Sequence, residues 1–170
     1  ACIDPDGHPD RSPFAAHLAA LPPGVRDHPT VSAAFLSVNR AVSTGNLVFT
    51  RDLHRRTGGF RDLPLCHDWD FVLSACRLGE PAYVDRPLYD YRLHGDNSFR
   101  DLVADAREEG EAVVGRFVEA VFRGEVRNPA LAAFADTRTL FDQLLACSGS
   151  AVAHIAQTIA GGSGARGLPS

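Results

Sequence analysis

The spacing of apolar residues along this chain changes three times, and each change predicts a different kind of element. Residues 1–30 are rich in Pro, Asp, Gly and His, so we expect mostly loop there. Residues 31–50 are apolar and β-branched with an interruption at 43–46, which predicts two short extended pieces flanking a tight bend. Gly45 in that bend predicts a close approach of the backbone to a neighbouring group.

Two short helices are predicted in the next part of the chain. Residues 51–56 predict a helix that ends at the glycine pair 58–59, after which Phe60 is expected to turn inward. A second helix is predicted from Asp68, which can cap it, and its apolar residues repeat at helical spacing up to Gly79.

Strand spacing then gives way to helical spacing. Residues 81–84 and 88–93 predict two short strands. After Ser98, apolar residues recur at helical spacing, although Gly110 weakens the middle of the pattern. The Asn128-Pro129 pair then provides a cap and a proline at the first position of a further helix.

The end of the sequence predicts one more helical piece, over residues 151–160, before a glycine-rich stretch at 161–170 that suits a flexible linker or tail. The chain starts at Ala1 and contains no Met. We therefore expect it to be a piece of a longer protein that continues past Ser170.

Composition narrows the class of protein. With 170 residues, 45% of them hydrophobic and 22% charged, the chain suits one soluble globular domain. A net charge of −4 argues against a nucleic-acid partner, because counterion release requires a basic face. No apolar run has the roughly 20 residues that a membrane helix needs. The four cysteines are far apart and form no CxxC pair, so we expect reduced core residues.

Candidate chemistry is densest at His67-Asp68-Trp69-Asp70. A carboxylate at a helix N-terminus stays ionised, so Asp68 can accept a proton from a hydroxyl, or it can serve only as a helix cap. His67 and Asp70 fit supporting or solvated roles better than catalysis. The neighbours of Trp69 at helical spacing are apolar, which favours a core anchor over a sugar platform.

A second group of candidates could hold a cation. His94 follows a predicted strand, where an imidazole can bind a metal or phosphate, or can be an ordinary core or surface histidine. Asp4 and Asp6 have the spacing of a metal-binding DxD pair, although Gly7 favours a plain turn. The chain contains no zinc spacing, no glycine-rich phosphate loop and no GxSxG nucleophile motif.

Four segments, in order and spacing, resemble the family 2 glycosyltransferases of the GT-A fold. They are Thr44-Gly45-Asn46-Leu47-Val48-Phe49, Gly58-Gly59-Phe60, His67-Asp68-Trp69-Asp70, and residues 87–94 with Asn97-Ser98. The resemblance covers residues 1 to about 100. It implies an α/β fold: a partial, Rossmann-like GT-A domain at residues 1–100 without its N-terminal nucleotide-binding half. A helical extension at 101–160 and the tail at 161–170 follow it.

The resemblance also implies roles for particular residues. Asp68 takes the place of the general base that deprotonates the acceptor hydroxyl in inverting transfer, and His94 matches a histidine that contacts the metal or diphosphate. His67 departs from the residue usual before the base. The family's DxD motif would lie upstream of Ala1, with Asp4 and Asp6 in the turn after it. The remaining donor- or acceptor-site positions are Thr44, Gly45, Asn46, His67, Trp69, Asp70 and Arg92.

The predicted partners are a nucleotide-sugar donor, a saccharide or other hydroxyl acceptor, Mn²⁺ or Mg²⁺, and further domains of the same parent chain. This fragment alone is expected to be inactive. The expected setting is polysaccharide biosynthesis in the cytoplasm, with peripheral attachment to a membrane left open.

Two alternatives stay open. One is a metal-dependent phosphohydrolase using His54, His67-Asp68 and Asp101, against which the predicted strands argue because that chemistry needs an all-helical scaffold. The other is a non-catalytic binding or assembly module, in which residues 101–160 dock a partner.

Overall fold

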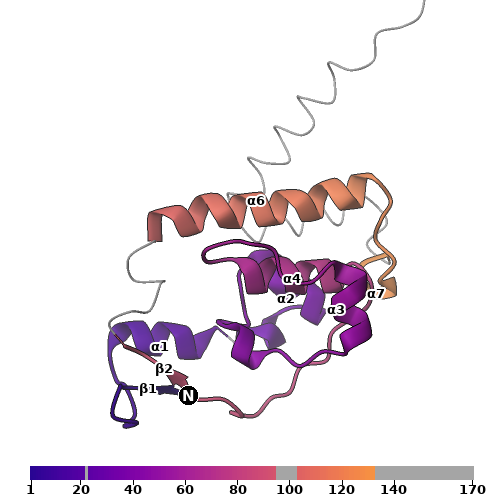
Figure 1. Cartoon of the computed structure of the whole chain (residues 1–170). Coiled ribbons are helices and arrows are strands. Elements are labelled where there is room, and N and C mark those ends of the chain that lie inside the picture. Colours follow the sequence, from indigo (N-terminus) through magenta and orange to yellow (C-terminus); the bar gives the residue numbers. More distant parts are fainter. Residues whose placement is uncertain (22, 95–102, 133–170) are drawn as a thin grey trace, which may run out of the picture.

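The computed structural model describes residues 1–21, 23–94 and 103–132, and it is built mainly of helices (Figure 1). Two short strands, β1 (Cys2–Ile3) and β2 (Tyr91–Arg92), form the one sheet among the described residues. The helices are α1 (Pro13–Ala20), α2 (Val31–Ser37), α3 (Arg51–Thr57), α4 (His67–Cys76), α6 (Val103–Phe122) and α7 (Pro129–Ala132), with 3₁₀ turns η1 (Pro23–Asp27) and η2 (Thr44–Asn46).

The larger core lies between α2, α4 and α6, and the long α6 crosses above the other two in Figure 1. Burial of apolar side chains drives this packing. On the α6 side it buries Val113 and Phe117, and on the α4 side it buries Val72 and Leu73. The helix predicted after Ser98 is therefore confirmed over Val103–Phe122 and shares one core with the segments before it.

Gly110 has a packing role in α6. A Cβ built at this position would lie 3.1 Å from the Trp69 ring, closer than such atoms normally approach. The glycine therefore allows α6 to lie directly on the indole of α4, which explains a residue that is otherwise unfavourable inside a helix.

A smaller second cluster joins α1 to the sheet. β1 and β2 run parallel, with Cys2 opposite Tyr91 and Ile3 opposite Arg92. Ala15 and Leu18 of α1 pack with Leu93, which follows β2. The prediction that residues 1–30 are mostly loop is wrong for α1, because Ser12 caps that helix and Pro13 begins it, a start signal that the surrounding Pro, Gly and Asp obscured.

The two extended pieces predicted between residues 31 and 50 are also wrong in part. Val31–Ser37 is a helix, capped by the Thr30 hydroxyl, which accepts from the Ala33 N–H at 3.0 Å. Every residue from Ser32 to Leu36 is buried, so the apolar run shows no helical face and cannot be told from a strand by its spacing. The bend itself is present as η2.

Only a fragment of the predicted strands at 81–84 and 88–93 is formed. Tyr91–Arg92 pairs with β1, and residues 81–84 and 88–90 are neither helix nor strand. Since a strand exists only where a neighbour offers a hydrogen-bonding edge, spacing alone overestimated its length.

Three helix signals are confirmed. α3 ends at Gly58, which has a φ of 83°, and its N–H bonds to the Arg55 carbonyl. α4 occupies the place predicted for the second helix. The buried Asn128 caps α7, and its carboxamide oxygen accepts from the Ala130 N–H at 2.9 Å.

Asn128 also closes a polar network in the main core. The two hydrogens of its Nδ2 are shared among three acceptors, the Ser32 hydroxyl, the Cys76 carbonyl and the Glu80 carboxylate, at 3.0, 2.9 and 3.0 Å. Glu80 in turn accepts from the Ser32 N–H at the start of α2. The network joins α2, α4 and α7, and its buried polar groups are satisfied.

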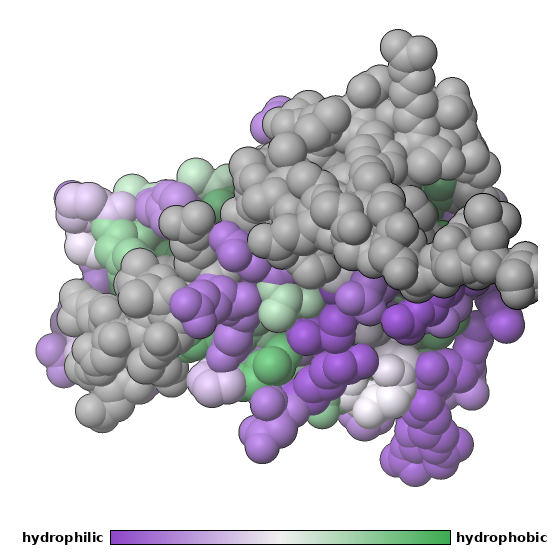
Figure 2. All heavy atoms as spheres, turned by 90° about the horizontal axis from the view of Figure 1, so that it is seen from above, coloured by the Kyte–Doolittle hydropathy of each residue, from purple (hydrophilic) through white to green (hydrophobic). Residues whose placement is uncertain are grey.

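Several predictions lie outside the described residues: the helical piece at 151–160, the tail at 161–170, Asn97-Ser98, Asp101 and Cys147. Cys2, Cys66 and Cys76 are free thiols; Cys66 and Cys76 are core residues as predicted, whereas Cys2 is only half-buried. No described helix is long and apolar enough to cross a membrane. Seen from above, the described part of the surface shows hydrophilic side chains with hydrophobic patches between them (Figure 2).

Candidate functional site

The candidate base lies in the first turn of α4, and the start of this helix differs from the sequence prediction. Cys66, not Asp68, is the N-cap, and its side chain makes no capping hydrogen bond. The Glu109 carboxylate of α6 takes that role by accepting from the N–H groups of Leu65 and Cys66 at 3.0 and 2.8 Å. A carboxylate at this position also suits the positive end of the helix dipole.

Asp68 is almost fully buried, with 4% of its surface exposed. Its Oδ1 accepts from the Trp69 N–H at 2.7 Å and from the Asn39 side-chain amide at 3.1 Å. One carboxylate oxygen is therefore held by two donors from two segments.

Burial raises the pKa of Asp68 above its ordinary value, and the bonds from Trp69 and Asn39 and the nearby His67 only partly offset this. The sequence prediction that helix position would keep this carboxylate ionised is therefore incomplete, because desolvation outweighs the favourable contacts. A raised pKa brings a carboxylate nearer to the range where it accepts protons efficiently at neutral pH.

His67 connects α4 to the predicted site turn η2. Its Nδ1 lies 3.2 Å from the Leu63 carbonyl oxygen, and its Nε2 lies 3.3 Å from the Thr44 hydroxyl. Since a carbonyl can only accept, we assign the proton of the neutral ring to Nδ1, which leaves Nε2 to accept from Thr44. This contact places the Thr44-Gly45-Asn46 motif beside the helix that carries Asp68.

Gly45, in the same turn, lies against Tyr89 of the motif segment at residues 87–94. A Cβ at Gly45 would lie 2.4 Å from the Tyr89 ring, which confirms the predicted close approach at this residue. Asn46 fixes the turn through its side-chain amide, which donates to the Ala41 carbonyl at 2.8 Å.

Aromatic rings join the remaining motif segments. The ring centroids of Phe49 and Phe60 each lie 4.6 Å from that of Phe71 on α4, and Phe60 also meets His67 edge-on at 6.2 Å. Phe60 contacts Phe71 and His67, but it is an exposed residue with 36% of its surface accessible, so the prediction that it turns inward is wrong. Described parts of all four motif segments therefore contact one another around η2 and the first half of α4, the fourth segment through Tyr89.

Trp69 and Asp70 face the protein rather than an open site. The Trp69 indole donates to the Phe35 carbonyl at 2.7 Å, as expected for a core anchor. Asp70 accepts from Arg116 of α6 at 2.8 and 3.0 Å, and its other oxygen lies 3.2 Å from Arg61. Both oxygens of this buried carboxylate are engaged with guanidinium groups, so Asp70 links α4 to α6.

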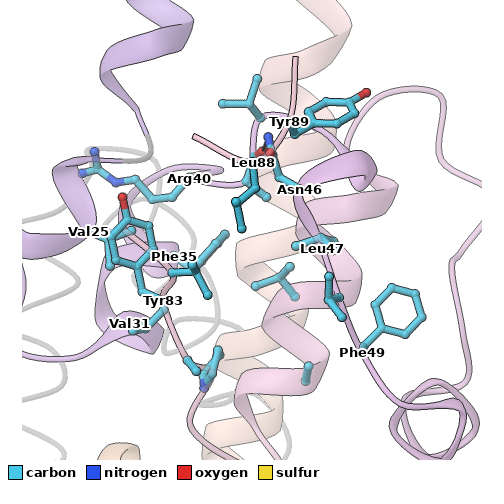
Figure 3. A pocket seen from close by; sticks show the side chains of 18 of the residues that line it. Val25, Val31, Phe35, Arg40, Asn46, Leu47, Phe49, Tyr83, Leu88 and Tyr89 are labelled. Carbon is cyan, nitrogen blue, oxygen red and sulfur yellow. Dashed lines mark hydrogen bonds between the residues drawn. The ribbon is translucent and has the colours of Figure 1, made fainter. Parts of the chain in front are cut away.

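A large apolar cavity of about 1020 Å³ lies on the other side of η2. Figure 3 shows side chains from α2, from residues 46–49 and from residues 83–89 around it. Gly45 and Asn46 line this cavity, whereas Asp68 is absent from its described lining. The geometry around Asp68, and not the size of this cavity, therefore defines the candidate site.

Asp4 and Asp6, two of the predicted cation ligands, lie in the turn after β1 together with His8, which the sequence did not predict as a ligand. Ligand atoms of Asp4, Asp6 and His8 lie within 4.8 Å of one another. The turn predicted here is also present, because Asp4 Oδ1 accepts from the His8 N–H at 2.8 Å, and this bond is the main reason that the pKa of Asp4 is lowered. Two carboxylates and an imidazole suit a divalent cation such as Mn²⁺.

Arg92 and His94 belong to the same end of the sheet. Arg92 donates to the carbonyls of Asp4 and Pro5 at 3.1 and 2.6 Å. Because β1 and β2 are parallel, the exposed His94 and the acidic loop both follow the carboxyl ends of neighbouring strands. The cluster of Asp4, Asp6 and His8 does not include His94, the main predicted cation ligand, and Asp68 lies in a different part of the fold.

Sequence reasoning missed four polar residues around the site: Asn39, Arg61, Glu109 and Arg116. Asn39 had one signal, since it is a polar residue inside an apolar run. Comparison with known proteins found no matching family, no similar curated protein and no similar solved structure.

Proposed function

We propose that this chain is the acceptor-side part of an inverting glycosyltransferase that moves a sugar from a nucleotide-diphosphate donor to an acceptor hydroxyl. The observation that carries the proposal is that described parts of the four motif segments contact one another around η2 and the first half of α4, the helix that holds the buried Asp68 with its raised pKa. The partial GT-A fold belongs to this proposal.

In this function Asp68 removes the proton from the attacking hydroxyl. Its Oδ1 is held by two donors, so the carboxylate does not need to reorient during the transfer. Thr44 and His67 fix the neighbouring turn, and Arg92 fixes the acidic loop. These residues position groups, and Asp68 performs the proton transfer.

A divalent cation belongs to the same proposal. The residues that would hold it are Asp4, Asp6 and His8. His94 follows β2, the strand that pairs with β1. Such an ion, when bound, offsets the negative charge of a departing diphosphate.

The decisive experiment measures nucleotide release by the longest natural chain that contains this sequence. UDP-, GDP- and dTDP-sugars are offered with candidate acceptors and Mn²⁺ or Mg²⁺. Asp68→Asn is expected to lower kcat by roughly 10²–10⁴-fold, the usual contribution of a general base. Asp62→Asn is the matched control, because Asp62 is an exposed carboxylate six residues away.

Retention of full activity by Asp68→Asn would remove the base from the proposal. Absence of release with every donor and acceptor, from a folded chain, would remove the transferase and favour the binding or assembly module.

The second candidate function is the metal-dependent phosphohydrolase. The mainly helical fold removes the objection that strands had raised against it. However, both ring nitrogens of His67 contact other groups, and His54 and Asp68 join no cation cluster among the described residues. If the purified chain held a transition metal tightly and had phosphatase activity, the phosphohydrolase function would be established in place of the transferase.

A further inference from the structure

We infer that Asn39 is a positioning residue for Asp68: its side-chain amide holds Oδ1 of the carboxylate and leaves Oδ2 as the oxygen that takes the proton. The catalytic meaning of this inference rests on the proposed function. The amide–carboxylate pairing itself does not, and it can be tested in a chain without measurable activity.

The orientation of the Asn39 amide follows from its second contact. Its Oδ1 accepts from the Ala41 N–H at 3.1 Å. Because a backbone N–H can only donate, the carboxamide oxygen must face Ala41, and Nδ2 must face Asp68, where it lies 3.1 Å from Oδ1. Both ends of this side chain are therefore used, and a flipped amide would place two acceptors together.

The two donors on Asp68 come from different parts of the fold. The Trp69 N–H belongs to α4 itself, whereas Asn39 follows α2. The carboxylate thus keeps its orientation only while α2 and α4 stay packed, a packing that Trp69 strengthens through its bond to the Phe35 carbonyl. Both donors bond the same oxygen, Oδ1, and we therefore assign the reaction with the acceptor hydroxyl to Oδ2.

The charged and titratable groups around Asp68 leave Asn39 with a distinct role. On α4, His67 favours the charged form of Asp68. Cys66 is the residue before His67. From α6, Glu109 and Arg116 act on Cys66. Asn39, after α2, is neutral and stabilises the carboxylate by donation alone. Among the described residues, Asn39 is the one whose side chain donates a hydrogen bond to the Asp68 carboxylate.

The test follows the Asp68 carboxyl carbon by ¹³C NMR during a pH titration of the whole chain, with Asp68→Asn identifying its signal. Asn39→Ala removes the donor, so the Asp68 pKa is expected to rise. Asn39→Asp keeps an acceptor for Ala41 but places a second carboxylate beside Asp68, so the rise is expected to be larger. The reversed pair, Asn39→Asp with Asp68→Asn, is expected to fold and to titrate at residue 39.

Thr30→Ala is the matched control. It removes the cap of α2 and so destabilises the same helix without touching Asp68, and it is expected to leave the titration unchanged. An unchanged Asp68 titration in both Asn39→Ala and Asn39→Asp overturns the inference. If Asn39→Ala does not fold, the comparison of Asn39→Asp with the reversed pair decides the question in the same way.

The turnover assay adds a second readout. With Asn39→Ala, kcat is expected to fall about 10–100-fold with KM unchanged, because misplacing a reacting group costs rate. The acidic limb of the pH profile is expected to move to higher pH. A changed titration with no turnover in any chain would retain the positioning role and reject the proposed function, so the two failures are distinguishable.

Discussion

Two carboxylates in this molecule, Asp68 in the helical region and Asp4 beside the sheet, have opposite electrostatic environments. Asp68 on α4 is buried and hydrogen-bonded to Asn39, which follows α2, and burial raises its pKa. Asp4 lies in an exposed turn, where backbone N–H groups lower its pKa. The difference shows that packing decides the chemistry of a carboxyl group: the first environment suits proton acceptance, and the second suits a permanently charged cation ligand.

The two regions also differ in how they are held together. The helical region buries large apolar side chains from four helices and is cross-linked by hydrogen bonds of Glu109, Asn128 and Asp70. The sheet region has two-residue strands and a small apolar cluster under α1. We therefore expect mutations in the helical region to cost more stability.

The largest expected effect comes from the helical core. Leu73→Ala removes a side chain that is 2% exposed, and we expect a loss of about 2–5 kcal/mol in the free energy of unfolding. Leu18→Ala in the sheet cluster is the counterpart, and its cost is expected at the low end of that range. Urea unfolding of both variants measures the difference, and equal costs would contradict the division into a strong and a weak region.

A smaller effect is expected where α6 caps α4. Glu109→Ala leaves the N–H groups of Leu65 and Cys66 without their carboxylate, and the expected cost is about 1 kcal/mol, typical of a lost cap. Glu108→Ala, an exposed neighbour on α6, is the control and is expected to be close to neutral. A Glu109 variant as stable as its control would mean that water replaces this cap fully.

The pH dependence of stability tests the buried carboxylate directly. A raised folded pKa means that the native state binds more protons than the unfolded chain, so the contribution of Asp68 is present below about pH 4 and lost as pH rises through its folded pKa. Asp68→Asn is therefore expected to gain stability relative to wild type over that range. Urea unfolding at several pH values provides the comparison, and a constant difference would argue against the raised pKa.

Asp4→Asn should give the smallest effect and the opposite sign. Since its folded pKa is lowered, Asp4 contributes stability above its unfolded pKa, and this is lost as pH falls through the folded value. The variant is expected to be slightly less stable than wild type at neutral pH and equal to it in acid. A difference that grows toward low pH would reverse the comparison with Asp68.

Local signals predicted the parts of the fold that depend on neighbouring residues in the chain. The glycine stop of α3, the Asn128-Pro129 start of α7 and the close approach at Gly45 all follow from backbone requirements of single residues. The wrong predictions share a different cause. Whether residues 31–37 or 81–84 become helix or strand depends on the surfaces that they meet, and no spacing in the sequence contains that information.

The sequence by itself determined where the candidate chemistry lies: Asp68 in the first turn of a helix, the motif turn at 44–46, and the acidic residues at 4–6. Only the tertiary structure decided the environment of these groups. Asn39, Glu109 and Arg116 reach α4 from segments 29 to 46 residues away. Desolvation and long-range hydrogen bonds act through space, so the properties of Asp68 arise only when the segment after α2 packs against α4.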